Sequence, residues 1–309
     1  MLALAAPASL KGVLSAFAAA KALGEGLRQG GASVVELPVA DGGEGTAEIL
    51  RLALGGEWRT ADVHDAFGRR RAAQWLLLPD GTAVVEAAAA VPLDPERLDP
   101  LAASSRGFGE LVAAALADRP SALLLCLGGT ATMDAGAGLL EIVGELPVAT
   151  RVACDVTATL AEAPRLFGPQ KGAGPAEVAE LARRFAAREE LVLIQHKPGG
   201  GAAGGLGAAL ASLGAELVPG AALVLDTVGF DPSGYDLVVT GEGRVDATTG
   251  LGKAPGEVAR RSAGTRCVVF GGIVDEPVPG TATVALSGDP ARAREDLIGL
   301  GRDLVLNQH

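Results

Sequence analysis

Short apolar runs alternate with alanine-rich stretches along the N-terminal part of the chain. The apolar runs predict strands and the alanine-rich stretches predict helices, in the order strand 2–6, helix 15–27, strand 33–39 and helix 47–54. Gly30 and Gly31 end the first helix. This alternation is typical of βαβ units and predicts a parallel sheet.

The alternation breaks after residue 55, where polar and apolar residues follow one another over shorter distances. The pattern predicts three short strands, at 57–64, 70–78 and 82–87. Turn sequences separate them, at Phe67-Gly68 and at Pro79-Asp80-Gly81. This stretch therefore reads as an antiparallel insertion that ends in a proline-rich segment.

From Ser104 onward the alternation of strands and helices returns. Strands are expected at 122–127, 148–153, 237–239 and 267–270, and helices at 105–116, 175–188, 291–302 and in a segment that ends at 213. The run 122–127 is continuously apolar, as in a strand that is buried on both faces.

These elements predict an α/β fold of two interleaved domains. We expect a Rossmann-like domain with a largely parallel sheet, formed by 1–55, 101–145 and 226–309. We expect a smaller inserted α/β domain with mixed or antiparallel strands, formed by 56–100 and 146–225. No low-complexity linker separates these segments, which favours interleaving.

Composition and charge narrow the classes of function. The net charge is -11 and no stripe of Lys and Arg is present, so a nucleic-acid partner is not expected. The three cysteines lie far apart, within or beside apolar runs, which predicts buried free thiols in a reducing, cytoplasmic setting. Neither a membrane span nor a signal peptide is expected, because no apolar stretch is long enough.

Several predicted strands end in a glycine-rich loop that carries a carboxylate. Such strand ends meet in one crevice of an open α/β sheet, where ligands bind. Glycine lets backbone N–H groups approach a phosphate, and carboxylates hold Mg²⁺ or accept a hydroxyl proton. The sequence contains no P-loop, dinucleotide fingerprint, zinc-ligand spacing or GxSxG elbow. Taken alone, the loops predict only an anion or metal site.

The glycine-rich loops occur in a fixed order along the chain. The segments are Ala6–Ala16, Ala40–Thr46, Ser105–Gly107, Gly128–Thr132, Ala153–Thr157, Phe167–Ala173, Gly201–Leu210, Thr240–Asp246 and Gly252-Lys253. In order and wording they resemble the bacterial type I glycerate kinase family. Three positions depart from the family pattern: Ala8 stands for an Asp, Met133 for an Asn, and Ala158-Thr159 for Asn-Pro. These departures bear on substrate preference and activity.

The resemblance implies an enzyme that uses ATP and Mg²⁺ to phosphorylate D-glycerate, at the 2-hydroxyl. Transfer to the 3-hydroxyl, another small hydroxy acid as substrate, and a non-catalytic nucleotide-binding homologue remain alternatives. A homodimer is compatible with the sequence.

Phosphoryl transfer requires cations for the phosphates, a metal ion, and a group that orients or deprotonates the hydroxyl. The matching loops supply the candidate catalytic residues Lys11, Asp41, Arg244 and Asp246, and the candidate metal ligands Asp41 and Asp155. The candidate residues for binding substrate and nucleotide are Gly42, Gly43, Glu44, Arg106, Gly128, Gly129, Thr130, Thr132, Asp134, Lys171, Gly201, Gly204, Glu242 and Lys253.

Overall fold

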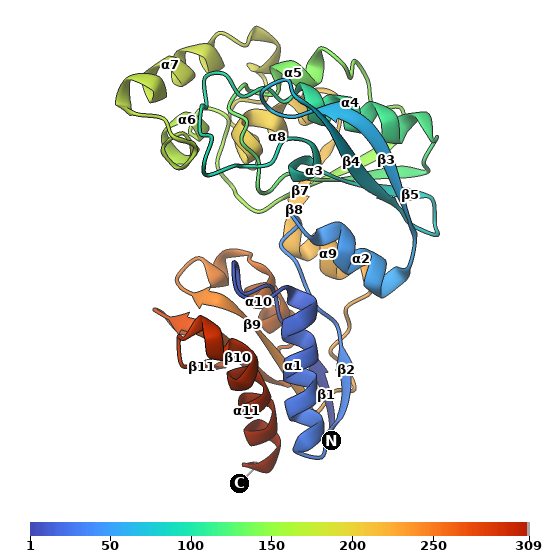
Figure 1. Cartoon of the computed structure of the whole chain (residues 1–309), viewed down its shortest axis with the longest axis vertical. Helices are drawn as coiled ribbons and strands as arrows, with labels where there is room; N and C mark the ends of the chain where they lie inside the picture. Colours follow the sequence, from blue (N-terminus) through green and yellow to red (C-terminus); the bar gives the residue numbers. More distant parts are fainter. Residues whose placement is uncertain (308–309) are drawn as a thin grey trace. The chain divides into compact units, whose positions relative to one another are not determined.

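Figure 1 shows the computed structural model, which describes residues 1–307. The chain forms two compact units. Unit 1 comprises residues 1–41 and the chain from Val224 onward, and unit 2 comprises residues 42–223. Each unit has its own sheet with helices packed on it, which confirms the predicted α/β fold.

Unit 1 contains a five-stranded sheet in which all neighbouring strands are parallel. The strand order is β11 (Ala282–Ala285), β10 (Arg266–Val274), β9 (Leu237–Val245), β1 (Leu2–Ala5) and β2 (Ser33–Glu36). From β1 the chain moves outward to β2, and it later re-enters the sheet at β9, on the other side of β1. The neighbours β1 and β9 thus form a topological switch point, where the crevice at the carboxyl ends of the strands binds ligands in folds of this kind.

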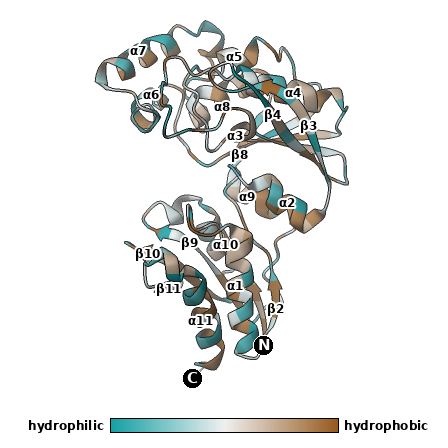
Figure 2. Ribbon diagram, viewed as in Figure 1, coloured by the Kyte–Doolittle hydropathy of each residue, from teal (hydrophilic) through white to brown (hydrophobic). Residues whose placement is uncertain are grey.

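Three helices complete unit 1: α1 (Ala16–Gln29), α10 (Ala254–Arg261) and α11 (Ala293–Leu306). Leu23 of α1 and Leu297 of α11 share one buried cluster with Phe270 of β10. Figure 2 shows hydrophobic and hydrophilic positions alternating along α1 and α11, as expected for helices with one buried face. The two helices approach closely, because a Cβ atom on Gly26 would lie 2.0 Å from the carbonyl oxygen of Ile298.

Unit 2 contains a six-stranded mixed sheet whose strands follow chain order. The strands are β3 (Glu57–His64), β4 (Arg70–Leu77), β5 (Thr82–Glu86), β6 (Ala122–Cys126), β7 (Ala149–Cys154) and β8 (Glu216–Pro219). The first three pair antiparallel, as the sequence predicted for 57–87, and the last three continue parallel to β5.

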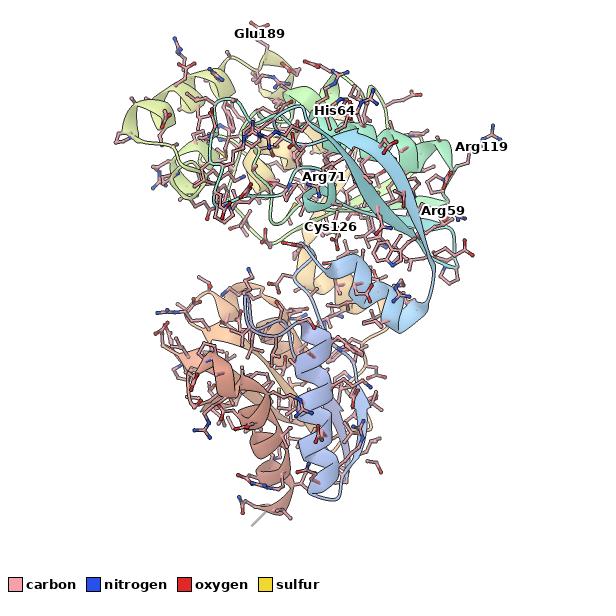
Figure 3. All side chains as sticks on the ribbon, in the orientation of Figure 1. Arg59, His64, Arg71, Arg119, Cys126 and Glu189 are labelled. Atoms are coloured by element: carbon pink, nitrogen blue, oxygen red, sulfur yellow. The ribbon has the colours of Figure 1, made fainter. Side chains whose placement is uncertain are left out.

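The α-helices that begin in unit 2 vary widely in length. They are α2 (Thr46–Leu54), α3 (Ala87–Ala90), α4 (Arg106–Ala117), α5 (Ala137–Leu140), α6 (Ala163–Phe167), α7 (Pro175–Ala186), α8 (Ala202–Ser212) and α9 (Gly220–Thr227), which continues into unit 1. In Figure 3, Arg119 and Glu189 extend from the periphery of unit 2, whereas Cys126 lies at the end of β6. Cys126 and Cys154 are buried free thiols, as predicted, and Cys267 is a partly buried one.

The division into units differs from the expected segments in two ways. Residues 101–145 were expected beside the N-terminal strands, but their strand β6 pairs with β5 and β7 in unit 2. A continuously apolar strand fits the centre of either sheet, and its pattern does not identify its neighbours. The inserted unit is also the larger of the two, because it contains both halves of the mixed sheet.

Two strands, β9 and β10, run further than the sequence indicated. Residues 240–245 were expected in a loop, but β9 extends to Val245 and pairs with β10 along its whole length. The glycines in this segment permit that pairing, since a Cβ atom on Gly241 would lie 2.2 Å from the carbonyl oxygen of Phe270. As a result, the polar residues Glu242 and Arg244 of this motif sit on the end of a strand. Within residues 1–307, no helix is both long and apolar enough to cross a bilayer.

Candidate active site

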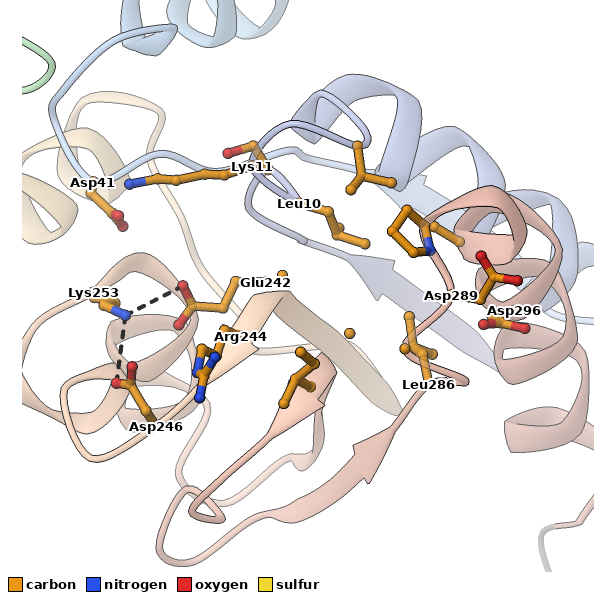
Figure 4. A pocket seen from close by; sticks show the side chains of 18 residues that line it. Leu10, Lys11, Asp41, Glu242, Arg244, Asp246, Lys253, Leu286, Asp289 and Asp296 are labelled. Carbon is orange, nitrogen blue, oxygen red and sulfur yellow. Dashed lines mark ion pairs between the residues drawn. The ribbon is translucent and has the colours of Figure 1, made fainter. Parts of the chain in front are cut away.

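A pocket of about 420 Å³ opens in unit 1 at the carboxyl ends of β1 and β9 (Figure 4). It therefore lies at the switch point of the parallel sheet. The lining brings together six of the residues predicted from separate motifs: Lys11, Asp41, Glu242, Arg244, Asp246 and Lys253. Their convergence explains why acids and lysines recur in loops that are far apart in sequence.

Asp41 is fixed by the N-terminus of α10. One carboxylate oxygen accepts the backbone N–H of Ala254 at 2.5 Å, across more than two hundred residues of sequence. The first N–H groups of a helix have no intrahelical acceptor, and a carboxylate there is also favoured by the helix dipole. Asp41 thus lines the pocket with one carboxylate oxygen engaged.

Glu242 lies on β9 and is more deeply buried than Asp246. The hydroxyl of Thr249 donates to its Oε1 at 2.7 Å, and the ammonium of Lys253 lies 3.7 Å from its Oε2. Burial raises the pKa of Glu242 above the usual glutamate value, although Thr249 and Lys253 act in the opposite direction. Glu242 is therefore a stronger base than an exposed glutamate.

Asp246 follows β9 directly and has the opposite environment. Its Oδ1 accepts the backbone N–H of Thr248 at 2.8 Å and also the Thr248 hydroxyl at 2.5 Å. These hydrogen bonds, with the ammonium of Lys253 at 3.6 Å, lower the pKa of Asp246. Asp246 is thus held ionised, and Lys253 bridges it to Glu242 (Figure 4).

Lys11 and Arg244 supply two further cations. Lys11 lies in the tight turn between Leu10 and Leu14, whose backbone groups pair with each other, and its side chain extends toward Asp41 (Figure 4). Arg244 forms an ion pair with Asp275 at 2.6 Å and is largely exposed. The carboxylate of Asp275 therefore partly neutralises the charge that Arg244 brings to the pocket.

The pocket carboxylates suit a metal ion that is shared with a ligand. Within residues 1–307, no group of three or more acidic, histidine or cysteine side chains is close enough to hold a metal by itself. Mg²⁺ is commonly bound by one or two carboxylates together with phosphate oxygens and water. Asp246 and Asp41 each have a second oxygen for this purpose, so the donor set fits Mg²⁺ bound with a phosphate.

Four predicted glycines of unit 2, Gly42, Gly43, Gly128 and Gly129, lie at the carboxyl ends of its parallel strands. The loops 42–44 and 128–130 touch backbone to backbone, because a Cβ atom on Gly128 would lie 2.8 Å from the Cα atom of Gly43. Gly42 and Gly129 both have positive φ. Glu44 is exposed beside Gly129.

The hydroxyl of Thr130 is buried and finds no hydrogen-bond partner among the side chains and backbone that the structure describes. A buried hydroxyl without a partner is costly, so this loop is suited to a ligand that supplies one.

Three other predicted residues are engaged within unit 2. Asp134 accepts hydrogen bonds from the backbone N–H and the hydroxyl of Ser105, and from the N–H groups of Gly136 and Gly138. The hydroxyl of Thr132 donates to the carbonyl of Ala203. Arg106 forms ion pairs with Glu110 and Glu141. These contacts join α4, α5 and α8 and give Asp134 a clear structural role.

Lys171 is almost fully buried and donates to the carbonyl oxygen of Thr132 at 2.9 Å. Burial lowers the pKa of Lys171 to about 8, while the charges of Asp134 and Asp155 act in the opposite direction. Gly204 packs on the same carbonyl, since a Cβ atom there would lie 2.0 Å from it.

The remaining two predicted residues also belong to unit 2. Gly201 packs in the same way against the carbonyl of Thr159. Asp155 directly follows β7, so the two predicted metal ligands, Asp41 and Asp155, belong to different units.

Two polar residues at these strand ends were not predicted. Thr249 orients Glu242, and only its position three residues after Asp246 could have indicated it. Glu86 ends β5 and accepts the N–H of Ala47 at the start of α2, and burial raises its pKa. An acid directly after an apolar strand was the available signal for Glu86.

Comparison with known proteins gives a consistent result. The model of the glycerate kinase family matches residues 3–148 and 145–286. Glycerate 2-kinase of Escherichia coli K12 is 38% identical over 304 residues, covering 82% of this chain and 80% of that protein. Glycerate kinase of Bacillus subtilis 168 is 36% identical, covering 86% and 83%. A crystal structure from Salmonella typhimurium LT2, provisionally assigned as glycerate kinase 2, matches with a TM-score of 0.83, 32% identity, and coverage of 99% and 98%.

Proposed function

Because the chain belongs to the glycerate kinase family, we propose that it transfers the γ-phosphoryl group of ATP to the 2-hydroxyl of D-glycerate. The chain is thus an enzyme of a kinase family, and the proposal concerns the donor, the metal ion and the position of transfer. The observation that supports it most strongly is the convergence of Lys11, Lys253 and three carboxylates in one pocket at the switch point of unit 1. Two lysines can neutralise phosphate charge there, as phosphoryl transfer requires.

In this proposal Lys253 and Lys11 bind phosphate oxygens and stabilise the charge that develops on them. Asp246 and Asp41 hold Mg²⁺, because hydrogen bonds keep Asp246 ionised and the α10 N-terminus fixes Asp41. When bound, Mg²⁺ neutralises phosphate charge and orients the phosphates.

Glu242 accepts the proton of the glycerate hydroxyl. The sequence favoured Asp246 or Asp41 as the base, but their environments differ from that of Glu242. Burial makes Glu242 the better proton acceptor, and Thr249 orients it by holding Oε1. The hydroxyl oxygen then forms its bond to phosphorus as the bond to the leaving ADP oxygen breaks.

Steady-state assays of ADP formation with D-glycerate, ATP and Mg²⁺ test the proposal. Lys253→Met should lower kcat by at least about tenfold through lost charge stabilisation. Lys21→Met is the matched control, because Lys21 lies on α1 in unit 1 and pairs with Glu36 outside the pocket. Folded wild-type protein that forms no ADP at millimolar substrate would refute the proposal. Equal activity of the two variants would exclude Lys253 from the site.

A further inference from the structure

The pocket of unit 1 has two chemically different ends. Figure 4 shows Lys11, Asp41, Glu242, Lys253 and Asp246 gathered on one side, and Leu286, Asp289 and Asp296 on the other. The lining also contains six apolar side chains: Leu10, Val13, Ile273, Leu286, Pro290 and Ala293. Ile273 pairs with Arg244 across β10 and β9 and so lies between the two sides. The lysines and Arg244 are the cations of the lining, and all three lie toward the first side (Figure 4).

Several of these apolar side chains are exposed to the pocket and its mouth. Ile273 on β10 is 47% exposed and Val13 in the turn before α1 is 38% exposed. Single exposed apolar residues are ordinary on protein surfaces, but here they gather around one cavity. Covering them with an apolar part of a ligand would remove that surface from water.

Glycerate does not suit the apolar end. A three-carbon hydroxy acid has almost no apolar surface, and a cavity of about 420 Å³ is within the range of sites for much larger ligands. Phosphates do not suit it either, because Lys11, Arg244 and Lys253, the cations of the lining, lie toward the first side and do not offset the carboxylates of Asp289 and Asp296. A flat, uncharged heterocycle with N–H and O–H donors nearby suits this end. The ring covers the apolar side chains, and the donors bind the carboxylates.

The two carboxylates of this end are fixed by their own hydrogen bonds. Asp289 accepts the N–H of Ala291 with one oxygen at 2.9 Å. Asp296 accepts the N–H of Ser287 with one oxygen at 3.0 Å. Asp289 has a second oxygen that can accept from ribose hydroxyls or from an exocyclic amino group, whereas the second oxygen of Asp296 lies 3.8 Å from the guanidinium of Arg292.

We propose that the pocket binds a nucleoside triphosphate lengthwise, with its phosphates at Lys11 and Lys253, its ribose along Ile273, and its base against Leu286 on the side of Asp289 and Asp296. This inference rests on the proposed function for the identity of the donor. It assigns the whole nucleotide to unit 1 and leaves the loops at 42–44 and 128–130 for other ligand groups.

Calorimetric titration with Mg²⁺-ATP and with Mg²⁺ and inorganic tripolyphosphate separates the two ends. Ile273→Ala combined with Leu286→Ala should raise the Kd of ATP by about tenfold through lost apolar contact. The Kd of tripolyphosphate should stay within about twofold of the wild-type value, since it has no base. Lys253→Met should weaken both ligands. Val35→Ala is the control, because Val35 is an exposed apolar residue of β2 outside the pocket.

Ile273→Ala alone guards against a folding defect, because Ile273 is half exposed, and it should raise the Kd of ATP by about threefold. An unchanged Kd for ATP in both variants, or an equal loss of ATP and tripolyphosphate affinity, would overturn the inference. The expected pattern without glycerate turnover would support the inference and refute the proposed function. Turnover without the pattern would do the reverse.

Discussion

The burial of Lys171 lowers the free energy of unfolding of unit 2 by a measurable amount. Burial holds its pKa near 8 in the folded protein, against 10.5 for an exposed lysine. In the unfolded chain the ammonium keeps its proton up to the higher value, so between about pH 8 and pH 10.5 the unfolded state binds more protons. Stability must therefore rise with pH across this window, at up to about 1.4 kcal/mol per pH unit for this group. Between about pH 7.5 and pH 10 the gain amounts to about 2 kcal/mol.

The Lys171→Met variant removes this contribution. Trp58 and Trp75 both lie in unit 2, on β3 and β4, so tryptophan fluorescence during urea unfolding reports on the unit that contains Lys171. Relative to the wild type, the variant should become less stable by about 2 kcal/mol as the pH is raised from about 7.5 to 10. Taking this difference cancels the opposite effect of the buried thiols, such as Cys154, whose pKa burial raises to about 12.

The control is Lys197→Met, which removes an exposed lysine of the same unit and tests whether the loss of any lysine there produces the same pH-dependent difference. A difference between the wild type and Lys171→Met that stays constant over the pH range would refute the reasoning. Lys171 would then have the same pKa in the folded and the unfolded state.

Three further predictions follow from packing and hydrogen bonding. Gly26→Ala should destabilise unit 1 by about 1–3 kcal/mol in far-UV circular dichroism melts, because the new Cβ would collide with the carbonyl of Ile298. The control Gly299→Ala, in open space on α11, should be neutral or slightly stabilising. Asp134→Ala should destabilise unit 2 by about 2 kcal/mol or more, measured by tryptophan fluorescence, because Ser105 and Gly138 lose their hydrogen-bond acceptor. A change in KM without a loss of stability would instead support the substrate contact that the sequence predicted. Thr249→Val should lower kcat and shift its acidic pH limit upward, because Glu242 loses a hydrogen bond that lowers its pKa; an unchanged pH profile would remove Thr249 from the site.

The sequence predicted the site of unit 1 better than its surroundings. The resemblance of the acid- and lysine-bearing loops to the family supplied Lys11, Asp41, Glu242, Asp246 and Lys253 as candidates, and the structure brings them into one pocket. It did not reveal their environments, because burial and partners arise only after folding. The hydrogen bond from Thr249 to Glu242, and the one from Ala254 to Asp41, depend on that fold.

Glycine-rich segments limited the prediction, because their composition does not identify what the backbone packs against. The segment 240–245 contains two glycines and suggested a loop, yet Gly241 is what allows β9 to pair closely with β10. Around Gly204 the same composition serves close packing against the carbonyl of Thr132. Composition reports that backbone atoms approach closely, but not whether the neighbour is a strand, a helix or a phosphate.

The assignment of strands to sheets was the other limit. The apolar run at 122–127 was correctly identified as a buried strand, but nothing in its pattern distinguishes the centre of one sheet from that of another. Long-range pairing decided the matter, through contacts with β5 and β7 that only the folded chain makes.

Identification of the product tests the central claim most directly. Wild-type protein is incubated with ATP, Mg²⁺ and D-glycerate, and the product is followed by ³¹P and ¹H NMR spectroscopy. We expect ADP and 2-phosphoglycerate, with the phosphorus coupled to the single proton on carbon 2. Formation of 3-phosphoglycerate, with coupling to two protons on carbon 3, or the absence of any phosphorylated product, would contradict the account.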